Sequence, residues 1–153
     1  MYIEALIELL QTLGLASKRD LLPCNARQIE EVRKAFGVNE LPMAYDEFLG
    51  HMGWGAGRFL MDTTATYPLA LENRNSAKEI ADHTGKWALP DEVIVIDVHD
   101  GYTFAYMMPD GPNPEVHSYL EGEALPKATG LNFVEFMFAV ARDSGRCNRP
   151  KDA

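Results

Sequence analysis

Residues Pro90–Leu120 read PDEVIVIDVHDGYTFAYMMPDGPNPEVHSYL and contain three apolar runs joined by two turns. The first run, Val93–Ile96, is a continuous β-branched segment of the kind found in strands covered on both faces. The second run, Tyr102–Met108, is also rich in strand-forming residues, and the third, Val116–Leu120, follows a proline-rich loop. Between the first two runs, Asp100-Gly101 can supply the two positive φ angles of a type I′ turn. We therefore predict a β-hairpin followed by a further strand.

The position of this turn also predicts which face each side chain of the hairpin occupies. A turn centred on Asp100-Gly101 places His99 opposite Tyr102, and the alternation of a strand then assigns the rest. One face has no charge and should lie under helices: Ile94, Ile96, Val98, Thr103, Ala105 and Met107. The other face is aromatic at its base and polar at its tip: Val93, Val95, Asp97, His99, Tyr102, Phe104, Tyr106 and Met108.

The same part of the chain is strongly acidic. Ala88 to Pro126 contains eight acidic residues and no lysine or arginine. Because the whole chain has a formal net charge of −9, all other segments together contribute only −1. A region this one-sided is either a solvated face or a surface for a basic partner. Its acids are Asp91, Glu92, Asp97, Asp100, Asp110, Glu115, Glu121 and Glu123.

Length and composition exclude several classes of protein. A chain of 153 residues, 46% of them hydrophobic, predicts one soluble globular domain. A sequence pI near 4.8 argues against direct binding of nucleic acid, which requires a basic surface. Cys24 and Cys147 form no metal-binding or disulfide pattern, so a reducing compartment is expected. The sequence also shows no signal peptide and no apolar run of membrane-spanning length. We therefore expect a cytoplasmic protein.

Two helices are predicted before the acidic region from apolar spacing and end signals. Tyr2–Leu13 is amphipathic, and its wide apolar stripe should dock on the body of the protein or on another chain. Asn25 can cap the second helix, with Gln28 completing a capping box. Gly37 fits the left-handed residue that ends such a helix.

A third helix should follow Pro42, and a last helix should close the chain. The third helix carries a core-facing stripe at helical spacing: Tyr45, Phe48, Leu49 and Met52. Asn132 and Glu135 form a capping box for the last helix, and Gly145 should end it. Its buried face should consist of Phe133, Phe136, Met137 and Val140.

The connection between the third helix and the hairpin is less strongly patterned. Arg58–Tyr67 suggests one or two short strands because it contains β-branched residues. Leu69–His83 should be helical in its second half, where Ser76 and Glu79 offer a capping box and Ile80 an apolar anchor.

No sequence motif of a catalytic or metal site is complete. Asp97, His99 and Asp100 form the best candidate cluster, since the first two lie on one predicted face about 7 Å apart. No third histidine, HExxH motif or cysteine ligand joins them, so polar groups at a hairpin tip are the simpler interpretation. Gly53–Gly57 lacks the lysine and hydroxyl of a phosphate-binding loop. Cys24 has no basic neighbour and is expected to be a small buried residue. We therefore predict no enzyme activity, no cofactor and no metal.

The aromatic residues of the hairpin and Trp54 are the remaining candidates for a binding surface. Tyr102, Phe104 and Tyr106 form either a binding stripe or part of the core, with Tyr102 closest to the turn and hence the most exposed. Trp54 lies among glycines, where it either packs onto the core or stands out as an anchor for a partner.

The order of these elements resembles the SUKH superfamily of Smi/Knr-type proteins over about Leu22 to Val140. The residues that carry the resemblance are Ile29-Glu30-Glu31, Leu41-Pro42, Tyr45-Asp46-Glu47-Phe48-Leu49, the Pro90–Ile96 strand, the acidic Asp100-Gly101 hairpin and Asn132-Phe133-Val134-Glu135-Phe136. In this chain, Met52-Gly53-Trp54-Gly55 stands where the family usually has an Asn-Gly-Gly-like turn.

The resemblance implies a single α+β domain with a twisted, largely antiparallel sheet flanked by helices. It also implies an organisation into an N-terminal amphipathic helix and connector (1–21), a SUKH-like domain (22–145) and a polar C-terminal tail (146–153). Bacterial members of the superfamily are typically immunity proteins that neutralise toxins, often nucleases, whereas fungal relatives are regulatory scaffolds of the cell wall.

By this resemblance we expect a non-enzymatic immunity protein that covers the basic cleft of a toxin with an acidic surface. The partner is expected to be a protein, neither nucleic acid nor a membrane. A regulatory or scaffold protein with a cellular partner remains the alternative, and a metal-dependent enzyme that uses Asp97, His99 and Asp100 is a third possibility. The residues expected to contact the partner are Trp54, Asp97, Asp100, Tyr102, Glu121 and Glu123.

Overall fold

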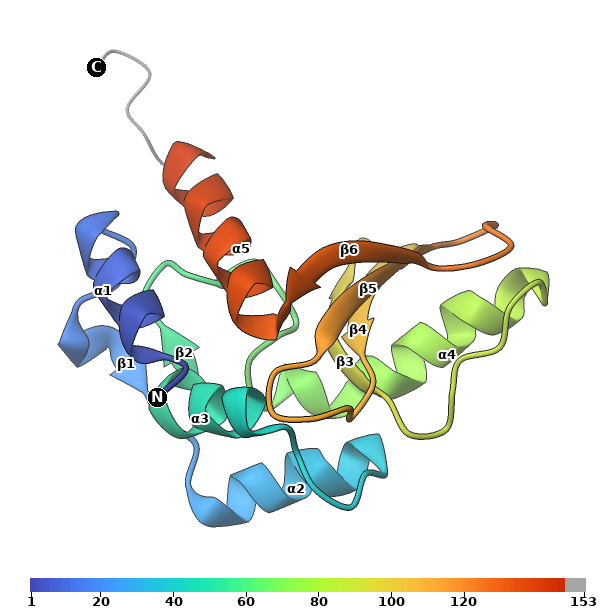
Figure 1. Ribbon diagram of the computed structural model, residues 1–153, viewed down its shortest axis with the longest axis horizontal. Helices are drawn as coiled ribbons and strands as arrows, with labels where there is room; N and C mark the ends of the chain where they lie inside the picture. Colours follow the sequence, from blue (N-terminus) through green and yellow to red (C-terminus); the bar gives the residue numbers. More distant parts are fainter. Residues whose placement is uncertain (148–153) are drawn as a thin grey trace.

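Four antiparallel strands in the order β3-β4-β5-β6 form the main sheet of this α+β protein. The computed structural model describes residues 1–147 (Figure 1). The strands follow one another in the chain and are β3 (Ile94–His99), β4 (Thr103–Met107), β5 (Glu115–Leu120) and β6 (Lys127–Asn132). A second, two-stranded antiparallel sheet pairs β1 (Leu21–Leu22) with β2 (Gly55–Ala56). The predicted fold class is therefore confirmed.

The described residues form five α-helices, most of them at one end of the main sheet (Figure 1). They are α1 (Glu4–Thr12), α2 (Ala26–Phe36), α3 (Met43–Met52), α4 (Asn73–Thr84) and α5 (Phe133–Cys147), with short 3₁₀ helices η1 (Lys18–Asp20) and η2 (Leu69–Glu72). Helix α4 lies along one face of the sheet. Helices α3 and α5 pack at the end of the sheet where β3 and β5 begin, and α1 packs against α5.

The helix ends show which local signals are correct. Asn25 and Gln28 form the predicted capping box of α2, with both hydrogen bonds 2.9 Å long, and Gly37 has the predicted left-handed conformation. Asn132 and Glu135 cap α5 in the same way. The prediction that Gly145 ends α5 is wrong, because the helix continues to Cys147. A Cβ at Gly145 would lie 3.3 Å from the Leu13 methyl carbons, so this glycine instead permits close packing of α1 and α5.

The turn between β3 and β4 has the predicted conformation but not the predicted register. Asp100 and Gly101 both have positive φ, at 51° and 75°. His99 nevertheless pairs with Thr103 and not with Tyr102, because Ile96 is an extra residue that forms a β-bulge. Beyond the bulge, each β3 side chain lies on the face opposite to the predicted one. Asp97 pairs with Ala105, and Val98 pairs with Phe104. The predicted faces are correct at the base of the hairpin and wrong at its tip.

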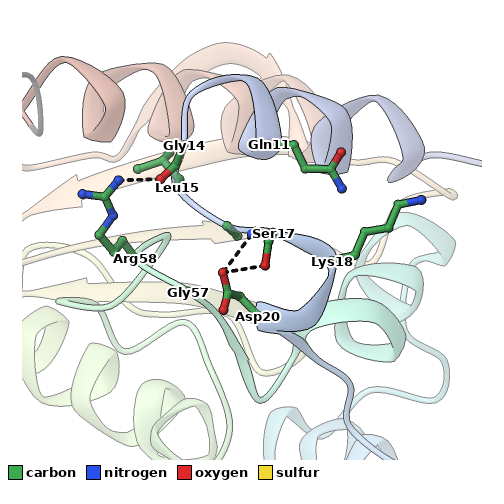
Figure 2. A pocket seen from close by; sticks show the side chains of 9 residues that line it. Gln11, Gly14, Leu15, Ser17, Lys18, Asp20, Gly57 and Arg58 are labelled. Atoms are coloured by element: carbon green, nitrogen blue, oxygen red, sulfur yellow. Dashed lines mark hydrogen bonds between the residues drawn. The ribbon is translucent and has the colours of Figure 1, made fainter.

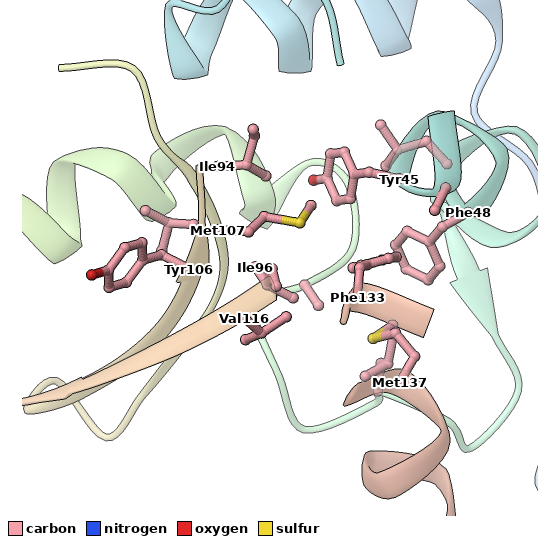
Figure 3. Close-up of a cluster of buried hydrophobic side chains, with 14 of the residues drawn as sticks. Tyr45, Phe48, Ile94, Ile96, Tyr106, Met107, Val116, Phe133 and Met137 are labelled. Carbon is pink, nitrogen blue, oxygen red and sulfur yellow. The ribbon is translucent and has the colours of Figure 1, made fainter. Parts of the chain in front are cut away.

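Both faces of the sheet are covered at the end where β3 begins. Figure 3 shows Ile94 and Met107 pointing toward Tyr45, while Tyr106 points to the opposite side of the sheet. On this side, Phe133 packs edge-on against Tyr45 and Phe48, with ring centroids 5.5 and 5.8 Å apart. On the other side, Trp87 stacks on an aromatic cluster that consists of Phe104, Tyr106 and Tyr119. Phe136 and Val140, expected in the core, are only partly buried.

Three further segments differ from the predictions. Residues 58–67 contain turns and one isolated bridge, from Phe59 to Ala56, but no strand. Some of their backbone groups bond to distant partners; for example, the Arg58 amide donates to the Leu15 carbonyl at 2.8 Å. Helix α4 begins at Asn73 directly after η2, so Ser76 lies inside the helix and caps nothing. Strand β6 was not predicted, since Lys127–Asn132 lacks strand patterning and is interrupted by a bulge around Gly130. Most of the predicted polar tail lies outside the described residues.

Candidate functional site

The end of the main sheet away from α3 and α5 brings four of the six expected contact residues together. Asp100 and Tyr102 belong to the β3–β4 turn, and Glu121 and Glu123 follow β5 directly. The Glu121 amide donates to the Tyr102 carbonyl at 2.8 Å, which joins the two segments, and the Glu123 amide closes a turn onto Leu120. We call this region, made of residues 99–102 and 120–125, the open end of the sheet.

Apolar side chains at the open end are exposed beside its acids. Tyr102 and Leu120 are each 46% exposed and Leu125 is 70% exposed. The sequence identified Tyr102 as the most exposed aromatic residue of the hairpin, and this is confirmed, since Phe104 and Tyr106 are buried. It did not identify Leu120 at the end of β5 or Leu125 in the following loop, because an apolar residue resembles a core residue until the covering elements are known.

Asp97 has a structural contact within the protein. Its Oδ1 accepts hydrogen bonds from the amide and the hydroxyl of Thr64, at 3.0 and 3.1 Å. The Thr64 hydroxyl in turn accepts from the Val98 amide at 2.9 Å, and the buried Asn73 donates to the Thr64 carbonyl. Asp97 therefore fastens residues 58–67 to β3 next to the bulge. This contact accounts for one of its two carboxylate oxygens.

His99 and Asp97 have different partners in the structure. His99 Nε2 lies 3.1 Å from Asp100 Oδ2 at the exposed tip, whereas Asp97 is turned to Thr64. Within the described part of the chain, no group of three or more histidine, cysteine or acidic residues can hold a metal ion. The arrangement matches the simpler interpretation, that of polar groups at a hairpin tip.

Trp54 lies in another part of the molecule. It follows α3, is 47% exposed and packs on Tyr67 with ring centroids 5.3 Å apart. The Tyr67 hydroxyl donates to Glu31 at 2.6 Å, and this hydrogen bond raises the pKa of Tyr67. Figure 1 places β2, next to Trp54, on the left and the loop after β5 on the far right. A single small contact patch cannot include both.

Most of the acidic residues between Ala88 and Pro126 are close in sequence but fall into two groups at different ends of the sheet. Asp100, Glu121 and Glu123 lie at the open end, whereas four others precede β3 or lie in and beside the β4–β5 loop: Asp91, Glu92, Asp110 and Glu115. Six strand residues span about 20 Å, which exceeds the screening length of about 8 Å at physiological salt. The acidic region is therefore two electrostatically separate surfaces.

A cavity of about 480 Å³ lies between the end of α1, η1 and the loop after β2. Its polar side chains form hydrogen bonds within the surrounding loops (Figure 2). Asp20 accepts from Ser17, and Arg58 donates to the Gly14 carbonyl. Hydrogen bonds from Ser17 lower the pKa of Asp20. These groups stabilise the loop and form no pair of nucleophile and base.

The buried thiol of Cys24 is also unsuited to catalysis. Its amide donates to the Leu49 carbonyl at 2.9 Å, which places the side chain under α3. Burial raises the pKa of Cys24 to about 11, so the thiolate that reacts as a nucleophile is scarce at neutral pH. The expectation of a small buried residue is confirmed.

Comparison with known proteins supports the resemblance seen in the sequence. Residues 23–139 match the model described as the SMI1 / KNR4 family (SUKH-1), and the predicted resemblance is confirmed. No curated protein and no solved structure gives a significant match. None of the helices in the described residues combines the length and the apolar character needed to cross a membrane.

Proposed function

Because the chain belongs to the SMI1 / KNR4 family (SUKH-1), we propose that it is an immunity protein, which binds a toxin in the cytoplasm and catalyses no reaction itself. Family membership is consistent with a protein-interaction domain of the immunity type. The proposed toxin is a basic protein, most simply a nuclease, whose substrate cleft is lined by cations.

The observation that carries the proposal is the combination of acids and exposed apolar side chains at the open end. Asp100, Glu121 and Glu123 share the open end with Tyr102 and Leu120, each of which is 46% exposed. Protein interfaces are typically organised in this way, with a few aromatic or aliphatic anchors inside a polar rim. A surface with this charge also complements a cleft that has evolved to bind phosphates.

The proposed mechanism is occlusion of the toxin's cleft. The acids accelerate encounter with the basic partner, and anchors that lose their water on contact slow dissociation. Of the six proposed contact residues, Asp100, Tyr102, Glu121 and Glu123 share the open end. Asp97 lies in β3 just before the turn and is hydrogen-bonded to Thr64. Trp54 can be contacted only by a partner that extends across the molecule.

The test is retention of partners by the tagged protein from its native cells, with washes at low and high salt and identification by mass spectrometry. We expect one basic toxin-like protein, released more easily by salt and by the variant Asp100→Asn/Glu121→Gln/Glu123→Gln. Co-expression of the recovered protein should then be toxic without the immunity protein and harmless with it. Recovery of cellular regulatory proteins alone would instead support the scaffold function.

A further inference from the structure

We propose that the space between α4 and the open end of the sheet is a pocket for one arginine or lysine side chain of the partner. The pocket has a volume of about 300 Å³. Helix α4 forms one wall with residues at helical spacing, Ser76, Glu79, Ile80 and His83. Val98, Gly101 and Glu121 of the sheet form the other wall. This inference takes the chemistry of the partner from the proposed function and adds where that partner is recognised.

The interior of the pocket suits the aliphatic part of such a side chain. Ile80 is 5% exposed and Val98 is partly buried, and both line the space between the two walls. Arginine and lysine cover apolar surface with their methylene groups while the charged head stays near water or a carboxylate. The volume accommodates one long side chain.

The charge of the pocket selects a cation. Glu79 and Glu121 stand on opposite walls, and no lysine or arginine lines the space between them. Within the described residues, the Glu79 carboxylate makes no hydrogen bond or ion pair, and the Glu121 carboxylate pairs only with His83, through Oε1 at 3.3 Å. A guanidinium can therefore bond to both carboxylates, and such charge-assisted bonds are the strong ones at interfaces.

The two neighbouring lysines do not compete for the pocket. Lys78 pairs with Asp82 at 2.6 Å, and the Lys86 ammonium donates to the Gly122 carbonyl at 3.1 Å. Both lie outside the lining of the pocket. The backbone amide of Glu121 donates a hydrogen bond to the Tyr102 carbonyl, which fixes the position of Glu121. The pocket and the exposed Tyr102 therefore form one continuous contact surface.

The test needs no toxin. The ¹⁵N-labelled full chain is titrated with N-acetyl-arginine amide, and with N-acetyl-citrulline amide as the uncharged control of the same shape. We expect saturable, salt-sensitive amide shifts at residues 76–83, 98–102 and 121 with the arginine probe only. Glu121→Gln and Glu79→Gln should each weaken binding roughly tenfold, the usual effect of removing one charge-assisted hydrogen bond.

Glu115→Gln is the matched control, because Glu115 also lies beside a histidine of the sheet, with His117 Nε2 at 3.5 Å, but near α5. It should bind the arginine probe like the wild type. Equal shifts with arginine and citrulline, or normal binding by Glu121→Gln, would overturn the proposal. Since the titration involves no toxin, such a result would leave the immunity function standing, and a failed toxin pull-down would leave the pocket standing.

Discussion

The two ends of the main sheet use similar residues for different purposes. At the end where β3 begins, apolar side chains of three strands are covered by α3 and α5 (Figure 3). The nearby acids precede β3 or lie in and beside the β4–β5 loop. At the open end, Tyr102, Leu120 and Leu125 remain exposed among Asp100 and Glu121. The difference is whether a helix covers the strand ends, since both ends contain apolar and acidic residues. Stability is therefore expected to depend on the covered end and binding on the open end.

The largest loss of stability should follow Phe48→Ala at the covered end. Phe48 is buried between Tyr45 and Phe133, and removal of such a ring costs about 3–5 kcal/mol of unfolding free energy. Urea unfolding followed by circular dichroism measures this loss. Phe136→Ala removes the same ring from a partly buried position on α5 and should cost clearly less. Equal losses would mean that burial at the covered end does not dominate stability.

Asn73→Ala should have the next largest effect, because it removes the buried hydrogen bonds that join α4 to residue 64 and to β3. The Asn73 side chain is buried and donates to the carbonyls of Thr64, Val95 and Ile96, at 2.9, 3.3 and 3.4 Å. Its loss leaves buried acceptors unpaired and should cost about 1–3 kcal/mol. Hydrogen exchange should also become faster at Thr64 and Val98. Asn75→Ala, at an exposed position two residues further along α4, is the control and should be nearly neutral.

Alkaline pH should also weaken the covered end through Cys24. Burial raises the pKa of its thiol from 9.0 to about 11, so the folded state holds the proton more tightly than the unfolded state does. The contribution to stability is complete below about pH 9 and is lost as pH rises toward 11, by about 1 kcal/mol per pH unit. The unfolding free energy should fall more between pH 8 and pH 10 for the wild type than for Cys24→Ala. An identical pH dependence of both proteins would exclude Cys24 as the cause of the loss of stability at alkaline pH.

The smallest effect on stability is expected at the open end. Asp100→Asn/Glu121→Gln/Glu123→Gln should change the unfolding free energy by about 0.5 kcal/mol or less, since these side chains are not buried. The same variant should slow association with a basic partner roughly tenfold at low salt, with little difference at high salt. Stopped-flow or surface-based kinetics at two salt concentrations test this. A matched variant, Asp91→Asn/Glu92→Gln/Asp110→Asn, should associate almost normally if only the open end binds.

Much of the candidate site could be predicted from the sequence, but its extent could not. The positive φ angles of Asp100-Gly101 and the exposure of Tyr102 follow from the turn itself. Glu79 and His83 were not identified, because α4 and the turn meet only in the folded protein. Asp97 was expected to face a partner, and its bond to Thr64 depends on a segment 33 residues away.

The sequence by itself determined the helix caps at Asn25 and Asn132, the hairpin turn and most of the buried residues. Each of these depends on residues within about four positions or on a regular apolar period, so the cause is contained in the local sequence. Only the tertiary structure decided the bulge at Ile96, the pairing of β6 and the division of the acids between two ends of one sheet. Those features depend on where distant segments meet, and packing of the whole chain settles which backbone groups pair and which charges become neighbours.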